Sequence, residues 1–135
     1  MSQPVLRRLT KRAQFLFVRQ GARAPRSTVM VEARRRADDT AFIGLGLTAS
    51  KKVGGAVERN RARRRLREAA RQLLPQFGLA GVDYVLVARQ ETPSAAWDRL
   101  LDDLRNALIR LRADLSPDAP KRGRQPPARS VSESE

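Results

Sequence analysis

The chain has 135 residues and a formal net charge of +14 at pH 7, from 28 Lys and Arg against 14 Asp and Glu. The length suits one domain, and so large a charge on a small domain favours a polyanionic partner. The absence of cysteine and histidine excludes disulfide frameworks, zinc fingers and catalysis by Cys or His. No apolar run approaches the ~18–20 residues of a membrane span, and no apolar segment of a signal peptide follows the first basic residues. We therefore expect a cytoplasmic protein without a membrane partner.

The positive charge is concentrated in two blocks. Residues 1–36 contain ten basic residues and one acidic residue, and residues 51–71 contain nine basic and two acidic ones. The rest of the chain is close to neutral. This asymmetry indicates a localised binding surface for a polyanion.

The first part of the chain predicts a helix followed by strands. Residues 6–20 have apolar side chains at helical spacing, with Thr10 as a plausible N-cap and Gly21 as a stop. Residues 28–33 and 41–48 are expected to be strands. In the second of these, Gly44 and Gly46 share one face with Phe42, so either another backbone approaches that face or the strand has a bulge.

The second part predicts two amphipathic helices separated by a strand. Residues 56–74 are expected to be helical up to Pro75. Residues 83–88 have the composition of a buried strand. Thr92 and Pro93 then resemble the start of a helix that runs to about Arg112. The apolar stripes of the two helices are Ala62, Leu66, Ala69, Ala70 and Leu73 in the first, and Trp97, Leu100, Leu101, Leu104, Leu108 and Leu111 in the second.

These elements predict an α+β fold, an α/β sandwich built on one small sheet. We expect a four-stranded mixed sheet and three helices in the order α-β-β-β-α-β-α, within a domain of residues 1–115. Residues 116–135 contain four prolines and too little apolar surface to offset the entropy of ordering, so this tail is expected to be disordered.

The arginine-rich helix is difficult to explain as a solvated face. Only Glu58 and Glu68 could compensate the nine basic residues of this block, so the cluster favours phosphate contacts. Arginine can bind phosphate bidentately. Lys51, Lys52 and two glycines precede the helix, where backbone N–H groups also attract phosphate. A membrane-surface helix would need bulkier apolar residues than this alanine-rich stripe.

The segment SKKVGGAVERNRARRRLREAAR, residues 50–71, closely resembles the RNR region of the bacterial ribonuclease P protein component. A weaker resemblance extends over residues 6–111. The resemblance implies a protein that assists a catalytic RNA subunit in removing the 5′ leader of precursor tRNA. It implies that the RNA subunit uses Mg²⁺, that no organic cofactor is needed, and that the protein has no catalytic residue and is inactive alone. It also implies a left-handed β-α-β crossover, against the general rule.

The resemblance assigns RNA contacts to the basic helix and the loop before it. Arg63, Arg65 and Arg71 are added by charge and position. Asn60 could be a polar residue of the helix start or could make a water- or metal-linked contact to RNA. The predicted RNA-binding residues are Lys51, Lys52, Arg59, Asn60, Arg61, Arg63, Arg64, Arg65, Arg67 and Arg71.

The resemblance also implies a cleft for the single-stranded leader between the sheet and the first helix. Phe15 and Phe17 match aromatic positions of the family and could stack on bases or belong to the core. A second cleft aromatic of many members is replaced by Arg19, and another falls near Val31. Gly44 stands where an arginine is common.

Two other functions are compatible with the composition. A ribosomal or assembly-type RNA-binding protein would share every compositional feature, so only the RNR spacing argues against it. A sequence-specific DNA-binding protein would need Asn, Gln or Ser on its recognition helix to contact base edges, and this helix is nearly all arginine. We therefore expect two RNA partners, the ribonuclease P RNA subunit in a 1:1 complex and precursor tRNA.

Overall fold

A computed structural model of the chain describes residues 4–115. The predicted tail of residues 116–135 lies outside this range. The elements in chain order are β1 (Leu6–Arg8), α1 (Arg12–Arg19), β2 (Ala22–Pro25), β3 (Val29–Arg35), β4 (Ile43–Thr48), a 3₁₀ turn (Lys51–Val53), α2 (Ala56–Phe77), β5 (Val82–Ala88) and α3 (Trp97–Asp114).

The strands form one mixed sheet in the order β1-β4-β5-β3-β2. β4 runs parallel to both β1 and β5, whereas β3 runs antiparallel to β5 and β2. The α+β class and the three helices are confirmed, but the predicted count of four strands was wrong, because the described chain forms five.

The additional strand is β1, which lies inside the segment predicted to be helical. Leu6 pairs with Ile43 of β4, and the helix begins only at Arg12, after a different N-cap from the predicted Thr10. The side chain of Gln14 accepts hydrogen bonds from the backbone N–H groups of Thr10 (2.8 Å) and Lys11 (2.9 Å). A three-residue strand is too short for its periodicity to be distinguished from one helical turn.

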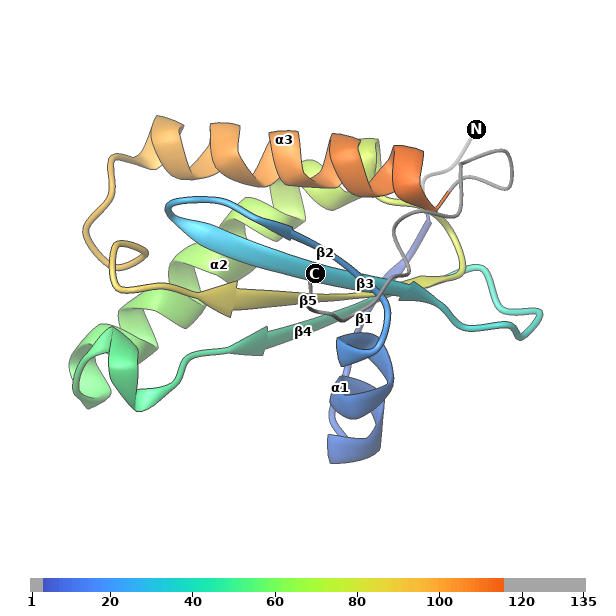
Figure 1. Ribbon diagram of the computed structural model, residues 1–135, viewed down its shortest axis with the longest axis horizontal. Coiled ribbons are helices and arrows are strands. Elements are labelled where there is room, and N and C mark those ends of the chain that lie inside the picture. The colour runs from blue at the N-terminus through green and yellow to red at the C-terminus, as the bar shows by residue number, and fades with distance from the viewer. Residues whose placement is uncertain (1–3, 116–135) are drawn as a thin grey trace, which may run out of the picture.

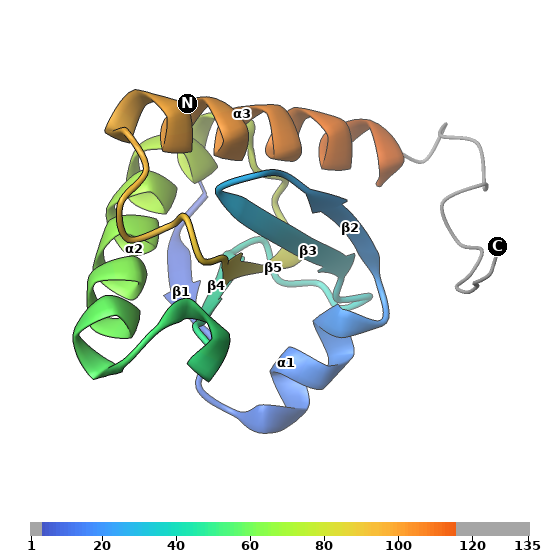
Figure 2. The same ribbon diagram turned by 60° about the vertical axis from the view of Figure 1, so that its left-hand side comes forward.

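The helices lie on opposite faces of the sheet (Figure 1 and Figure 2). α2 and α3 cover one face, where the main hydrophobic core lies, and α1 projects from the other. The side chains of β5 alternate between these two cores: Tyr84 and Leu86 point to the first, and Val85 points to the second. The predicted apolar stripe of α2 is confirmed, because all five of its members are buried. The stripe of α3 is confirmed in part, because Trp97 and Leu101 are only partly buried.

The glycine face of β4 is the face on which α1 packs. A Cβ atom added to Gly46 would lie 2.6 Å from the ring of Phe15. One added to Gly44 would collide with the side chains of Asp83 and Leu9. The close neighbours are therefore mainly side chains, and β4 pairs with β5 in continuous register without a bulge.

Two predicted helix boundaries were wrong. α2 continues through Pro75 to Phe77, because a proline in the last turn removes a single backbone hydrogen bond. Its terminal carbonyls, on Phe77 and Gly78, accept hydrogen bonds from Arg112 of α3. Thr92 does not cap α3, which begins at Trp97. Its buried hydroxyl instead donates to the carbonyl of Thr28 (2.6 Å) and accepts from the N–H of Arg89 (2.7 Å).

Candidate RNA-binding surface

The start of α2 is fixed by a short turn. The hydroxyl of Ser50 accepts a hydrogen bond from the N–H of Lys52 (3.3 Å) and so stabilises the 3₁₀ turn. Gly54 then has φ +143°, which favours glycine. The carboxylate of Glu58 accepts from the N–H of Gly55 (3.0 Å). Lys51 and Lys52 are consequently held exposed beside the N-terminus of α2.

Most of the predicted RNA-binding cations have no partner among the residues that the structure describes. In the part of the chain that the structure describes, none of six basic side chains makes a hydrogen bond, an ion pair or a ring contact. All six lie at least partly in solvent. Their charges are therefore available to an external anion. The six are Lys51, Lys52, Arg59, Arg61, Arg64 and Arg67.

Two further arginines of α2 have weak local partners. The guanidinium of Arg63 donates to the side-chain carbonyl of Asn60 (3.1 Å). Arg71 lies 3.6 Å from Glu68, and both side chains are more than half exposed, so this ion pair contributes little to stability. Asn60 is the fifth residue of the helix and not its N-cap. Its side-chain carbonyl orients Arg63, and its contact to RNA stays a prediction.

Arg65 is the exception among the predicted contacts. Its guanidinium donates to the backbone carbonyls of Thr92 (2.8 Å) and Ala95 (2.5 Å), and it lies 5.6 Å from the ring centre of Trp97. Arg65 thus fastens α2 to the segment before α3. Its position in the arginine run predicted an RNA contact, but its side chain is engaged inside the protein.

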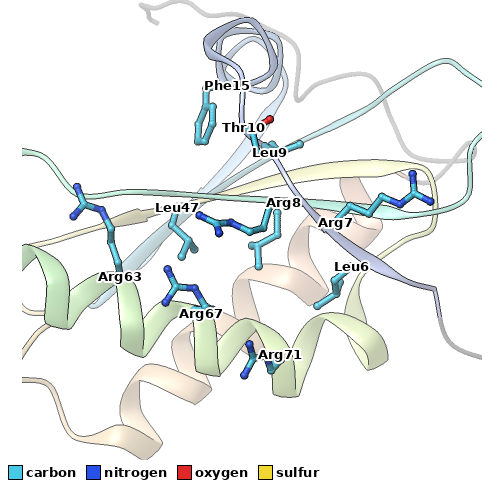
Figure 3. Close-up of a pocket in the computed structure, with 11 residues that line it drawn as sticks. Leu6, Arg7, Arg8, Leu9, Thr10, Phe15, Leu47, Arg63, Arg67 and Arg71 are labelled. Carbon is cyan, nitrogen blue, oxygen red and sulfur yellow. The ribbon is translucent and has the colours of Figure 1, made fainter.

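Basic residues of α2 line a groove that leucines of β4 also line (Figure 3). Arg63, Arg67 and Arg71 line this groove together with Phe15 of α1. Phe15 is partly buried, and it contacts the smaller core while one side faces the groove. Both interpretations of this residue, core packing and a binding surface, are therefore compatible with its position.

The other predicted cleft residues are arranged differently. The guanidinium of Arg34 covers the ring of Phe17 at 4.2 Å and donates to its carbonyl (3.1 Å), so one face of this ring is closed to a base. Arg19 is exposed. Val31 is fully buried in the core under α2 and α3, on the opposite face of the sheet, so its identity has no effect on the surface beside α1.

A buried carboxylate, that of Glu32, lies on the face of the sheet on which α1 packs. Glu32 of β3 has a side chain only 8% exposed and pairs with Arg23 of β2 at 3.3 Å. Burial raises the pKa of Glu32 above its usual value, and the charges of Arg23 and Arg19 oppose that rise. Arg19 therefore influences the electrostatics beneath α1 from the helix surface.

A second hollow, of about 600 Å³, opens at the ends of β3, β4 and β5. Lys52 lines it together with Met30, Val87 and Arg89. Sequence reasoning identified only Lys52 here. The alternation of side chains along β3 and β5 could have shown that Met30 and Val87 lie on the α1 face. That the ends of three strands meet at one hollow depends on the sheet order, which no local pattern predicts.

Comparison with known proteins identifies the family. The family model described as Ribonuclease P matches residues 4–112. A ribonuclease P protein component from Caulobacter vibrioides is 51% identical over 108 residues, which cover 80% of this chain and 72% of that protein. The chain belongs to the ribonuclease P protein family.

Other ribonuclease P proteins support the same assignment. The protein component from Ruegeria pomeroyi is 52% identical over 107 residues, 78% of this chain and 86% of that protein. Solved ribonuclease P proteins from Staphylococcus aureus and Thermotoga maritima have TM-scores of 0.66 and 0.65 at 25% and 26% identity. They cover 78% and 77% of this chain, and 94% and 96% of their own lengths. Family membership favours a subunit of ribonuclease P over a ribosomal or assembly-type RNA-binding protein.

Proposed function

We propose that this chain, as a subunit of the endoribonuclease ribonuclease P, binds the RNA subunit through the exposed arginines of α2. The observation that carries the proposal is the set of six basic side chains at and before α2 that have no partner among the described residues. The opposite face of α2 packs in the core, so the helix is rigidly held while its cations face solvent. An array of guanidinium groups on a rigid helix can contact phosphates at low entropic cost.

We further propose that the single-stranded leader of precursor tRNA binds beside α1. The hollow at the strand ends supplies Arg89 for phosphates, with Met30 and Val87 as apolar contacts, and Lys52 lies where it meets the surface assigned to the RNA subunit. Arg19 extends the basic surface along the helix. Phe17 contributes less than the resemblance implies, because Arg34 already covers one face of its ring.

The chemical step is assigned to the RNA subunit, with Mg²⁺ bound there. This chain has no cysteine or histidine, and within residues 4–115 no group of three acidic side chains is placed to hold a metal ion. Its contribution is to bind RNA and to lower the repulsion between phosphates, which reduces the Mg²⁺ concentration that the RNA requires.

Two finer features belong to the same proposal. The β4–α2–β5 unit joins parallel neighbouring strands, and we infer the left-handed crossover that the family resemblance implies. Processing of precursor tRNA by ribonuclease P would place the protein in the cytoplasm.

No helix within the described residues is long and apolar enough to cross a membrane.

Reconstitution tests the proposed function. The full chain is added to a bacterial ribonuclease P RNA at an Mg²⁺ concentration too low for the RNA alone, and cleavage of precursor tRNA is measured. We expect cleavage at the mature 5′ end only when both components are present. Absence of stimulation, at concentrations where the protein is folded, would contradict the proposal, and so would cleavage by the protein alone.

A further inference from the structure

The groove beside α2 has a second wall that the RNR motif does not include. The groove has a volume of about 540 Å³ and lies between α2, β1 and α1. β1 and the residues after it form one wall, α2 forms the other, and β4 provides the floor. The lining residues are Leu6, Arg7, Arg8, Leu9, Thr10, Phe15, Leu45, Leu47, Arg63, Arg67 and Arg71.

The groove coincides with an uncovered stretch of the sheet edge. β1 pairs only with Ile43–Leu45, the first half of β4. Residues 46–48 of β4 pair with β5 on one side, and no described strand covers their other side. Leu47, in this uncovered half, lines the floor of the groove.

The two arginines of β1 have different surroundings. The guanidinium of Arg7 lies over the ring of Phe42 at 4.8 Å and points away from α2 (Figure 3). Arg8 points into the groove toward Arg67 (Figure 3). Its side chain has no hydrogen bond or ion pair with any described residue, so no internal contact explains this orientation.

The chemistry of the groove selects a polyanion with apolar parts. None of the described residues that line it is acidic, and the one ion pair at its border, Arg71–Glu68, is exposed and long. Arginines facing one another across a groove repel until an anion lies between them. The leucines of the floor and the ring of Phe15 cannot bind phosphate but can contact a sugar or a base.

The size of the groove indicates one strand and not a duplex. A volume of 540 Å³ lies within the range of small-molecule sites, about 300–1,000 Å³, which corresponds to about one or two nucleotides. The bases of a duplex are stacked and paired, so they could not reach the floor, whereas unpaired bases can turn toward apolar and aromatic side chains.

We propose that this groove holds an unpaired segment of the RNA subunit, with Arg8 on one side of its phosphates and the arginines of α2 on the other. Leu45 and Leu47 of the floor contact the base or sugar of the same nucleotides. The RNA subunit is the source because α2, which forms one whole wall, is the helix assigned to that RNA. The inference therefore rests on the proposed function, and it adds a β1 residue outside the RNR motif to the interface.

The first experiment measures the affinity of the full chain for ribonuclease P RNA without substrate. Arg8→Ala is compared with Arg99→Ala, which removes the same charge from α3, where Arg99 pairs with Glu91 at the surface. We expect Arg8→Ala to weaken binding about five- to tenfold and to reduce the slope of log affinity against log salt by about 0.7. Arg99→Ala should bind as the wild type does, and Arg8→Lys should retain part of the affinity. Equal affinity of the two alanine variants would overturn the inference.

A second experiment identifies the nucleotides in the groove. The chain has no cysteine, so Arg8→Cys provides a single attachment point for an iron–EDTA reagent that cleaves nearby RNA. In the complex with RNA subunit and precursor tRNA, we expect cleavage in an unpaired segment of the RNA subunit, and no such cleavage from Arg99→Cys. Cleavage confined to precursor tRNA, cleavage within a continuous helix, or no cleavage would each contradict the inference.

The two proposals can fail separately. The wild type can stimulate precursor tRNA cleavage while the Arg8 variants show the same RNA affinity and the same cleavage positions as the Arg99 variants. In that case the groove assignment is wrong and the proposed function stands. If the wild type gives no stimulation, the proposed function fails, and the groove assignment fails with it. A melting curve for each variant verifies that the exposed side chain of Arg8 can be replaced without unfolding.

Discussion

Glu32 shows how a single charge is accommodated under α1. Its carboxylate is buried on the sheet face on which α1 packs, and its ion-pair partner Arg23 is half exposed. Desolvation exceeds the attraction of the nearby arginines, so the pKa of Glu32 is raised. The folded state consequently holds this proton more tightly than the unfolded chain does. The contribution to stability is full at low pH and is lost as pH rises through the folded-state pKa.

Replacing Glu32 with Gln tests this balance. At pH 7 the ionised carboxylate is unfavourable in its buried site, so we expect Glu32→Gln to raise the melting temperature. The difference from the wild type should narrow as pH falls through the raised pKa, because the wild-type carboxyl then becomes neutral too. Thermal unfolding followed by circular dichroism across this range provides the measurement. A lower melting temperature for the variant at pH 7 would show that the Arg23 ion pair outweighs desolvation.

Individual arginines are where sequence reasoning was least able to separate function from structure. Arg61 and Arg65 lie one turn apart on α2 in the same basic run, yet only Arg65 is engaged by the protein. The carbonyls that it contacts belong to Thr92 and Ala95, about 30 residues later in the chain. No local pattern encodes that proximity, because it depends on how the segment before α3 crosses the end of α2.

At the scale of elements, residue ranges could be predicted for the long helices and strands, whereas the short strands could not be located. The stripe of α2 extends over several turns, so its buried face could be identified from spacing alone. β1 and β2 contain three and four residues, and a segment of that length has no distinctive period. They become strands because an existing edge, on β4 or β3, supplies hydrogen-bond partners. The groove was missed for the same reason, since β1 forms one of its walls.

The attachment of α2 to the segment before α3 can be tested through Arg65. Arg65→Ala leaves two partly buried carbonyls without their charged donor, so we expect a loss of about 1–3 kcal/mol in the free energy of unfolding. Urea denaturation gives this quantity. Arg64→Ala, at the neighbouring exposed position, is the matched control and should be near neutral. A variant of Arg65 as stable as the Arg64 control would contradict the structural role.

For the whole molecule, the division of charge follows the fold. Several arginines stabilise the protein, among them Arg36, which pairs with Asp83 at 2.6 Å, and Arg112, which bonds to the carbonyls at the end of α2. Among the described residues, six cations without partners gather at the start and along one side of α2, and Arg8 of β1 faces α2 across the groove. The net charge of +14 therefore predicted a polyanionic partner correctly as a class. It could not indicate which basic residues remain available for that partner.

The affinity of the full chain for ribonuclease P RNA, measured against salt for the wild type and for Arg61→Ala/Arg64→Ala, tests the central claim most directly. If the six free cations each neutralise a phosphate, log affinity should fall against log salt with a slope of about −4, at about 0.7 per phosphate. The double variant should bind at least tenfold more weakly, with a slope near −2.8, while its melting temperature stays within a few degrees of the wild type. A slope unchanged by the substitutions, or a loss of affinity that merely follows a loss of folding, would contradict the account.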